Sequence, residues 1–184
     1  MIGTHDSFTF LKPRNFIFNI FSFLWRTQTK NIEEQKMSGT LFLDIRVCRY
    51  KGKWCLCHGI VKFNKMFDNL EDIVNTYSEF KLRILLEKGN NEDKEKFKQE
   101  ISTIQNKYEN LLFVAIKKNW VILKNNIPLI FDYTFVPFYS EFSFWENFKS
   151  FRWFNTIKNY AKTHKPKITQ NMIDDKNIHF IDLI

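Results

Sequence analysis

LFLDIRV (residues 41–47) and LRILLE (residues 82–87) are near-continuous apolar runs of strand length, and the amphipathic stretch DNLEDIVNTYS (residues 68–78) lies between them. Continuous apolar runs are typical of strands that are buried on both faces, as in a parallel sheet. The apolar residues of the middle stretch share one helical face: Leu70, Ile73, Val74 and Tyr77. With Asp68 as a plausible N-cap, the pattern predicts a strand, a helix and a second strand.

The same alternation continues in both directions along the chain. Further strand-like runs are residues 1–5, 54–58, 112–117, 128–133 and 178–184. Helix-like stretches cover residues 91–110 and 142–163. Alternation of this kind predicts an α/β protein with a parallel sheet covered by helices, either open or closed into a barrel. We find no repeat or linker, so we expect one domain over residues 1–184.

The composition is that of an ordinary globular protein with a basic surface. Hydrophobic residues make up 44% and charged residues 26% of the 184 residues, and the net charge is +8. A positive surface favours anionic partners, such as phosphorylated ligands, anionic lipid or nucleic acid. The alternative is that the charge serves solubility alone.

The cysteines and the apolar runs indicate in which cellular compartment the protein works. The three cysteines, Cys48, Cys55 and Cys57, form no complete disulfide framework, and the last two share one face of a predicted strand as core thiols. No secretory signal is visible, and FIFNIFSFLW (residues 16–25) is about half as long as a membrane-spanning helix needs to be. We expect a cytoplasmic or host-cell interior location, peripheral at membranes.

Three polar side chains stand at the ends of predicted strands. His5 ends the first, Arg46 lies near the end of the second, and His58 ends the third. In a β/α barrel, groups at the carboxyl ends of successive strands converge on one mouth. An arginine matches the oxygens of a phosphate, and two histidines can act as base and acid. The trio suits phosphodiester chemistry, but by itself it leaves open the alternative that each histidine is an ordinary core or loop residue.

Several motifs resemble the X region of phosphatidylinositol-specific phospholipases C, especially the bacterial type. MIGTHDS (residues 1–7) resembles the opening motif, SGTLFLDIRV (residues 38–47) the strand with Asp-x-Arg, and CHG (residues 57–59) the His-Gly turn. The other matches follow in the same order: Trp25 to Gln28, Ile32 to Gln35, Leu70 to Ile73, and residues 178–184. The resemblance covers residues 1–88, with weaker agreement over residues 157–184.

The resemblance implies a distorted or incomplete (β/α)8 TIM-type barrel that cleaves the glycerol–phosphate bond of a phosphatidylinositol-like lipid. His5 would be the general base, oriented by Asp182, and the attack would form a cyclic inositol phosphate. His58, paired with Asp6, would protonate the departing diacylglycerol oxygen. Arg46 would stabilise the charge on the phosphate.

The chain departs from the family pattern at residues that decide whether a metal ion is bound. Glu87 stands where the bacterial type tends to carry lysine, and with Asp6 and Asp44 it could form an oxygen-rich site for calcium or magnesium. Arg46, however, stands where the calcium-dependent type places a metal-ligating carboxylate. We therefore expect no metal or other cofactor, with the Asp6, Asp44 and Glu87 site as the alternative.

Contacts with the head group are less well defined by the sequence. Asp44 and Glu87, near the ends of their strands, are candidates. Lys117 and Tyr133 also lie near predicted strand ends, and the alternative is that they are ordinary rim residues.

The apolar run after the first strand suits a lipid surface. It carries the aromatic residues Phe16, Phe18, Phe21 and Trp25 and has basic residues on both sides. In bacterial relatives the matching helix enters the membrane interface. The alternative is a helix that covers the barrel and buries these residues.

The partners expected are a phospholipid substrate and a peripheral membrane surface, with no nucleic acid, whereas the oligomeric state is left open. Two other functions remain open. One is a related phosphodiesterase with a different head group or a divalent-metal requirement, and the other is a membrane-binding module that has lost catalysis.

Overall fold

The strand, helix and strand pattern predicted over residues 41–87 is confirmed. In the computed structural model, β2 (Phe42–Tyr50) and β5 (Lys81–Lys88) pair in parallel, and α3 (Leu70–Thr76) lies between them in the chain. The structure describes residues 2–4, 6–22, 26–116, 119–121, 129–130 and 178–181.

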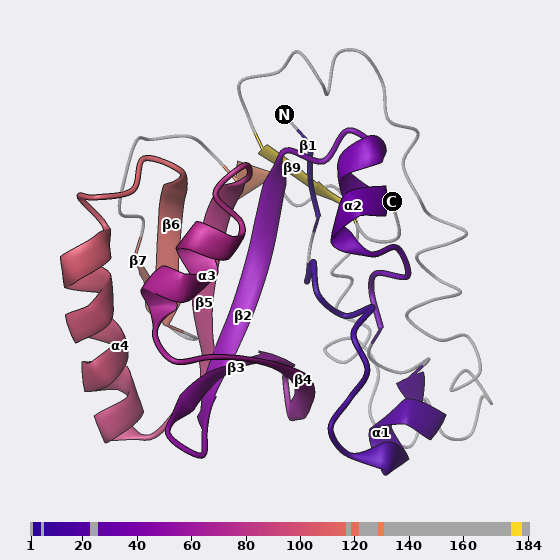
Figure 1. The fold of residues 1–184 in the computed structure, drawn as a ribbon, viewed down its shortest axis with the longest axis horizontal. Helices are drawn as coiled ribbons and strands as arrows, with labels where there is room; N and C mark the ends of the chain where they lie inside the picture. Colours follow the sequence, from indigo (N-terminus) through magenta and orange to yellow (C-terminus); the bar gives the residue numbers. More distant parts are fainter. Residues whose placement is uncertain are drawn as a thin grey trace.

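The described strands form one curled sheet in a mixed α/β fold (Figure 1). Its order is β7-β6-β5-β2-β1-β9-β8, and the pairs from β6 through to β8 are parallel. The remaining strands of this order are β1 (Ile2–Thr4), β6 (Leu111–Ile116), β7 (Asn119–Val121), β8 (Leu129–Ile130) and β9 (Ile178–Ile181). The curled sheet forms a half-barrel and agrees with the incomplete barrel predicted from the sequence.

One predicted strand differs from the prediction in its direction. Residues 54–58 belong to β3 (Lys53–His58), which is antiparallel to β2, and β4 (Val61–Phe67) is antiparallel to β3. The turn from β2 to β3 consists of Lys51 and Gly52, with φ values of 50° and 79°. Two consecutive residues in the left-handed region match the twist of a tight hairpin, and glycine adopts that region at little cost. The expectation that β3 is a third parallel strand is therefore wrong.

Two helices cover one face of the sheet (Figure 1). The N-cap of α3 is Asn69 and not Asp68, because the Asn69 side chain accepts a hydrogen bond from the Asp72 N–H. The longer helix, α4 (Asn91–Ile104), begins with a capping box between Asn90 and Asp93 and ends before the predicted residue 110. A turn over residues 105–107 follows it.

The core lies between these helices and the outer face of the sheet. Apolar side chains of β2 and β5 at alternate positions are fully buried against it: Leu43, Ile45, Val47, Leu82, Ile84 and Leu86. A carboxylate oxygen of Glu100 on α4 accepts hydrogen bonds from the Trp54 indole on β3 and from the Leu70 N–H at the start of α3, both at 2.8 Å. One partly buried side chain thereby joins both helices to the sheet.

Two further elements lie away from this layer. α2 (Ile32–Met37) lies beside β1, whereas α1 (Phe16–Ile20) lies near β4, at the end of the sheet where the parallel strands finish (Figure 1). Within the described part of the chain, every helix is too short or too polar to cross a membrane. The predicted helix over residues 142–163 and most of the predicted strand over residues 128–133 lie outside the described residues.

Candidate active site

The inner face of the sheet carries charged side chains where the outer face carries apolar ones. Asp44 and Arg46 on β2, and Arg83 and Glu87 on β5, are at alternate positions of their strands and therefore share a face. All four side chains are at most 10% exposed. A buried cluster of charges is costly unless its members are paired, so its contacts decide whether it is stable.

Arg46 is the centre of this cluster. Its Nε forms an ion pair with Oδ1 of Asp6 and lies 3.4 Å from Oδ2 of Asp44, and a terminal nitrogen lies 3.3 Å from Oε2 of Glu87. Burial by itself would lower the pKa of Arg46, but the nearby charges of Asp6, Asp44 and Glu87 outweigh it, so the pKa is raised. The guanidinium is a permanent cation held at a defined position.

Asp6 is held in an uncommon backbone conformation directly after β1. Its φ is 48°, in the left-handed region that a non-glycine residue adopts at a cost. The Asp6 N–H donates to Oδ2 of Asp44 at 3.3 Å, and the next residue, Ser7, exchanges hydrogen bonds with the Asp44 backbone. The loop after β1 is thereby docked onto β2, and this docking directs the Asp6 carboxylate at Arg46.

Residues of two quoted motifs support the same loop. The Thr9 hydroxyl accepts hydrogen bonds from the N–H groups of Thr27 and Gln28, at 3.1 and 2.7 Å. The Gln35 side chain on α2 donates to the carbonyl of Ser7 at 2.8 Å. All of these side chains are buried. In this structure the Thr-Gln and Gln positions of the motifs therefore hold the Asp6 loop in place.

His58 joins the cluster through Asp6. Its Nε2 lies 3.1 Å from Oδ2 of Asp6, so one carboxylate contacts both the histidine and Arg46. Its other ring nitrogen, Nδ1, is buried and has no hydrogen-bond partner among the described residues. Gly59, with φ of 58°, begins the turn into β4. His58 thus reaches the cluster by an antiparallel return and not as the end of a third parallel strand.

Arg83 is a member of the cluster that the sequence analysis missed. One of its terminal nitrogens lies 3.2 Å from Oδ1 of Asp44, and the side chain is 1% exposed. The available signal is an arginine inside an apolar strand, four residues before Glu87 and therefore on the same face. Arg83 acts on Arg46 through Asp44, which contacts both guanidinium groups.

The other predicted residues fall into two groups. Asp44 and Glu87, predicted as head-group contacts, both contact Arg46. The remaining predicted residues lie outside the described residues: His5, Trp25, Lys117, Tyr133 and Asp182. Within the described residues, no group of three acidic, histidine or cysteine side chains has a metal-binding arrangement. The three carboxylates of the alternative metal site instead face the Arg46 guanidinium.

The aromatic run after the first strand lies at the carboxyl end of the sheet (Figure 1). Phe16 is 72% exposed and Phe21 is 45% exposed, whereas Phe18 packs partly against the core. Part of this segment therefore faces outward and part covers the core, and its role at a lipid surface stays a prediction.

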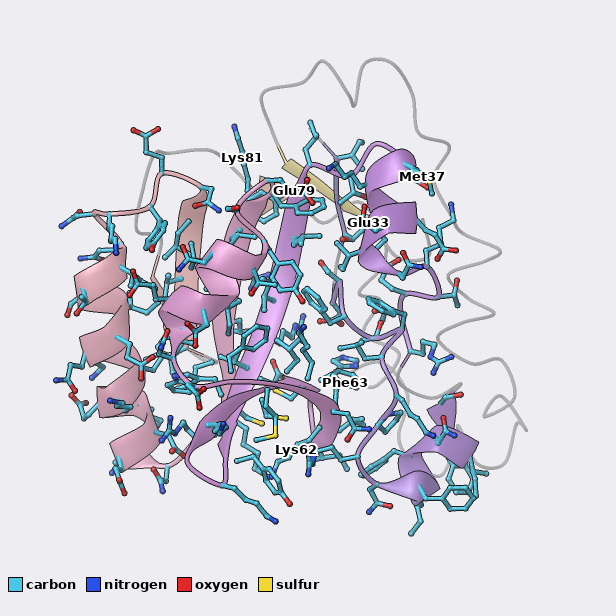
Figure 2. The ribbon with its side chains drawn as sticks, in the orientation of Figure 1. Glu33, Met37, Lys62, Phe63, Glu79 and Lys81 are labelled. Atoms are coloured by element: carbon cyan, nitrogen blue, oxygen red, sulfur yellow. The ribbon has the colours of Figure 1, made fainter. Side chains whose placement is uncertain are left out.

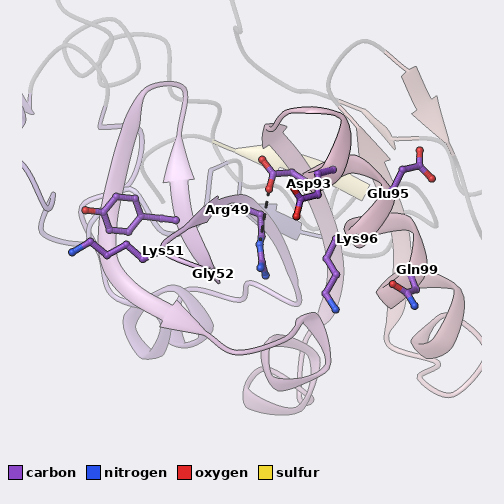
Figure 3. Close-up of a pocket in the computed structure, with 9 residues that line it drawn as sticks. Arg49, Lys51, Gly52, Asp93, Glu95, Lys96 and Gln99 are labelled. Carbon is purple, nitrogen blue, oxygen red and sulfur yellow. Dashed lines mark ion pairs between the residues drawn. The ribbon is translucent and has the colours of Figure 1, made fainter.

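A cavity of about 900 Å³ lies elsewhere, between the turn from β2 to β3 and the first turns of α4 (Figure 3). Its lining is of mixed charge and includes Arg49, which lies 4.0 Å from Asp93. Arg49 is on the face of β2 opposite to Arg46, packed over the Trp54 ring. Of the predicted catalytic residues that the structure describes, Asp6, Arg46 and His58, none lines this cavity.

Comparison with solved structures finds bacterial phosphatidylinositol-specific phospholipases C. The enzyme from Listeria monocytogenes is 19% identical, with a TM-score of 0.44 over 61% of this chain and 40% of that chain. A mutant form of the Staphylococcus aureus enzyme is 14% identical, with a TM-score of 0.45 over 98% of this chain and 70% of that chain.

Another S. aureus structure, obtained in connection with modulation of that enzyme's membrane binding, is 23% identical, with a TM-score of 0.38. It is matched over 61% of this chain and 39% of that chain. No family model and no curated protein matches the chain. At TM-scores of 0.44 and 0.45, the likeness assigns no role to any residue of this chain.

Proposed function

We propose that the chain is a phosphatidylinositol-specific phospholipase C-like phosphodiesterase with a distorted or incomplete (β/α)8 barrel. The observation that carries the proposal is the contact of one carboxylate, Asp6, with both Arg46 and His58 at one end of a parallel sheet. This arrangement puts a fixed cation beside a carboxylate–histidine pair. A phosphodiester needs such a cation for its non-bridging oxygens and such a pair for its leaving group.

The proposed reaction assigns one proton to each histidine. His5, oriented by Asp182, takes the proton of the inositol 2-hydroxyl, and that oxygen forms a bond to phosphorus. The bond from phosphorus to the glycerol oxygen breaks, and His58 gives a proton to the departing diacylglycerol oxygen. The proposal assigns this proton to Nδ1 of His58, because Asp6 already lies against Nε2.

The positive charge in this proposal comes from Arg46, without a metal ion. The guanidinium lies among the three carboxylates that the calcium or magnesium alternative requires. A metal at that position would have to compete with a buried cation already paired with Asp6, Asp44 and Glu87. The planar group also matches two phosphate oxygens at once.

The proposed substrate lies in a membrane, which gives the exposed part of α1 a role. The scissile phosphate of a phospholipid is at the level of the head groups, so the carboxyl end of the sheet has to face the bilayer. Phe16 and Phe21 would enter the interface beside that end, as apolar faces of interfacial helices do. The phospholipid and a peripheral membrane surface are therefore the proposed partners.

A head-group screen tests the proposal. Purified protein is incubated with short-chain phosphatidylinositol, phosphatidylcholine, phosphatidylethanolamine and phosphatidylserine, and the products are identified by phosphorus NMR. We expect a cyclic inositol phosphate and diacylglycerol from phosphatidylinositol alone, and turnover reduced by about 10² to 10³ in the Arg46→Gln variant. Turnover of another head group would contradict the substrate, and vesicle binding without any turnover would favour the inactive membrane-binding module.

A further inference from the structure

Three cations gather around one aromatic ring near the end of β2. The Arg14 guanidinium carbon lies 4.7 Å from the centre of the Tyr50 ring, the Lys62 Nζ 4.6 Å and the Lys51 Nζ 5.7 Å. Each distance is within the range in which a cation is attracted to the face of an aromatic ring. We call Tyr50 with these three cations the Tyr50 cluster.

Backbone pairing brings the members of the Tyr50 cluster together. Pro13 forms an isolated bridge with Phe63, and the Arg14 N–H donates to the carbonyl of Lys62 at 2.8 Å. Lys51 follows Tyr50 in the tight turn to β3. The cluster therefore joins three segments that are distant in sequence, and it does so through the main chain and not through mobile side chains alone.

These positive charges lack the counter-charges that other basic residues of the protein have. Within the described part of the chain, Arg14, Lys51 and Lys62 form no ion pair with a carboxylate. By contrast, Lys36 pairs with Glu79, Lys53 with Asp68, and Lys107 with Glu71.

Like charges around one ring repel one another, and the ring offsets only part of that repulsion. An anion with several oxygens would offset the rest, and a phosphate group matches arginine and lysine donors.

The position of the Tyr50 cluster indicates where such a phosphate comes from. Arg14 directly precedes Asn15, the N-cap of α1, whose Phe16 is among the most exposed apolar residues described. Figure 2 shows Lys62 at the end of the molecule opposite to Lys81 and Met37, and α1 lies at the same end as β4 in Figure 1. Basic residues next to an exposed apolar helix suit an anionic lipid surface.

We propose that the Tyr50 cluster is a second phosphate site, which binds the head group of an anionic phospholipid in the membrane without cleaving it. Tyr50 lies four residues beyond Arg46 on the same face of β2, about 13 Å along the strand. A lipid held there would orient the carboxyl end of the sheet toward the bilayer. The inference rests on the proposed function only in taking a membrane as the surface on which the protein works.

Vesicle sedimentation tests this site without any turnover. Arg14→Gln, Lys51→Gln and Lys62→Gln are compared, singly and combined, on vesicles of phosphatidylcholine alone and of phosphatidylcholine with phosphatidylserine. The matched control is Lys81→Gln, which removes the same charge from an exposed residue at the opposite end of the sheet (Figure 2). Thermal unfolding of each variant verifies the fold.

We expect each substitution in the Tyr50 cluster to weaken binding to the phosphatidylserine vesicles about fivefold, and the triple variant about a hundredfold. Lys81→Gln should change it less than twofold, and Lys62→Arg should bind as the wild type does. Binding to phosphatidylcholine alone should be unchanged in every variant.

Four outcomes would overturn the inference. Equal losses of vesicle binding for Lys81→Gln and the cluster variants would mean that net charge alone attracts the vesicles. Equal losses of binding on both vesicle types would mean that the cluster does not recognise the charge of the lipid. If glycerol phosphate at millimolar concentration binds the same residues more tightly than vesicles do, the ligand of the cluster is a soluble phosphate. Loss of RNA binding without loss of vesicle binding would indicate a nucleic acid. A wild type that binds through the cluster but cleaves no phospholipid would reject only the proposed function.

Discussion

Arg46 combines deep burial with three carboxylate contacts, and the proposed chemistry depends on it. Its side chain is 10% exposed, and Asp6, Asp44 and Glu87 raise its pKa. Arg83 supports the same arrangement, because it contacts the Asp44 carboxylate that Arg46 also contacts. The site is thus a network in which removal of one charge leaves other buried charges without a partner.

For Arg46→Gln we expect kcat/KM on a short-chain monomeric phosphatidylinositol to fall by about 10² to 10³, the scale of losing one key electrostatic donor. Arg46→Lys should recover part of the activity, since it restores the charge without the planar fork. Urea unfolding of both variants serves as the control, because Arg46→Gln also leaves Asp6, Asp44 and Glu87 facing one another. A well-folded Arg46→Gln with wild-type kcat/KM would contradict the proposed role.

The three thiols lie on the same face of the sheet as Arg46 and are buried together, as the sequence predicts for Cys55 and Cys57. Cys48 faces Cys55 across the β2–β3 pair. Its hydrogen bond with Cys55 acts to lower the pKa of Cys48, but its hydrogen bond with Cys57 and its burial outweigh this and raise the pKa to about 12. All three thiols are free in this structure.

The raised pKa makes the stability of the fold sensitive to high pH. A thiol in an unfolded chain loses its proton near about pH 8.5, whereas Cys48 in the folded chain keeps it to about 12. Its contribution is therefore complete below about pH 8.5 and decreases as the pH rises toward the folded value. Between about pH 8 and pH 10, we expect the free energy of unfolding of Cys48→Ala to fall by about 2 kcal/mol less than that of the wild type, measured by urea unfolding. Equal pH dependence of the two proteins would argue against a buried, protonated Cys48.

At the scale of elements, α1 and its C-cap combine a residue packed against the core with apolar residues that are exposed. Phe18 packs partly against the core, but Phe16 and Phe21 are 72% and 45% exposed on an element of only five residues. Contact with a lipid interface would bury the exposed parts of these aromatic side chains.

The combined substitution of Phe16 and Phe21 by serine should weaken vesicle binding and lower activity on vesicles about tenfold or more, because apolar burial in the interface is lost. Hydrolysis of a monomeric short-chain substrate should change little. Met37→Ser is the matched control, since Met37 is 79% exposed at the opposite end of the sheet (Figure 2). Equal losses on vesicles and monomers would mean that these residues serve the fold.

The start of α4 is a second element whose stability can be tested. The Asn90 side chain accepts a hydrogen bond from the Asp93 N–H at 2.8 Å, and the Asp93 carboxylate accepts one from the Asn90 N–H at 3.1 Å. Asn90→Ala should lower the free energy of unfolding by about 1 kcal/mol, measured by urea denaturation. Asn106→Ala, at an exposed position in the turn after α4, should change it by less than half as much. A larger effect at residue 106 would show that the cap is not the source.

For the whole molecule, removal of metal ions tests whether the positive charge at the site comes from Arg46 or from a metal. If Arg46 supplies it, turnover of phosphatidylinositol should persist in excess EDTA within about twofold, because no charge is removed from the site. Complete loss in EDTA with recovery on adding calcium or magnesium would instead favour a metal bound by Asp6, Asp44 and Glu87.

The site could be predicted from the sequence in part. Asp44 is placed beside Arg46 by the alternation of one strand, and Glu87 is singled out by the family resemblance; their contacts in the structure agree with a shared face. Arg83 obeys the same alternation but was missed, because an arginine inside an apolar strand gives no sign of its partner. His58 was expected in the cluster for the wrong reason, since it arrives on an antiparallel strand.

Residue periodicity was enough to determine β2, α3, β5 and the buried faces of each, because which side of a strand or helix is apolar is a local property. Strand direction around the hairpin, the capture of Asp6 by Asp44 and Arg46, and the meeting of Arg14 with Lys62 were decided only in the folded chain. Each of these joins segments far apart in sequence, or depends on a turn whose backbone angles outweigh the strand pattern. The sequence does not show which residue a charged side chain pairs with, and for a buried charge that pairing decides whether its burial is stable.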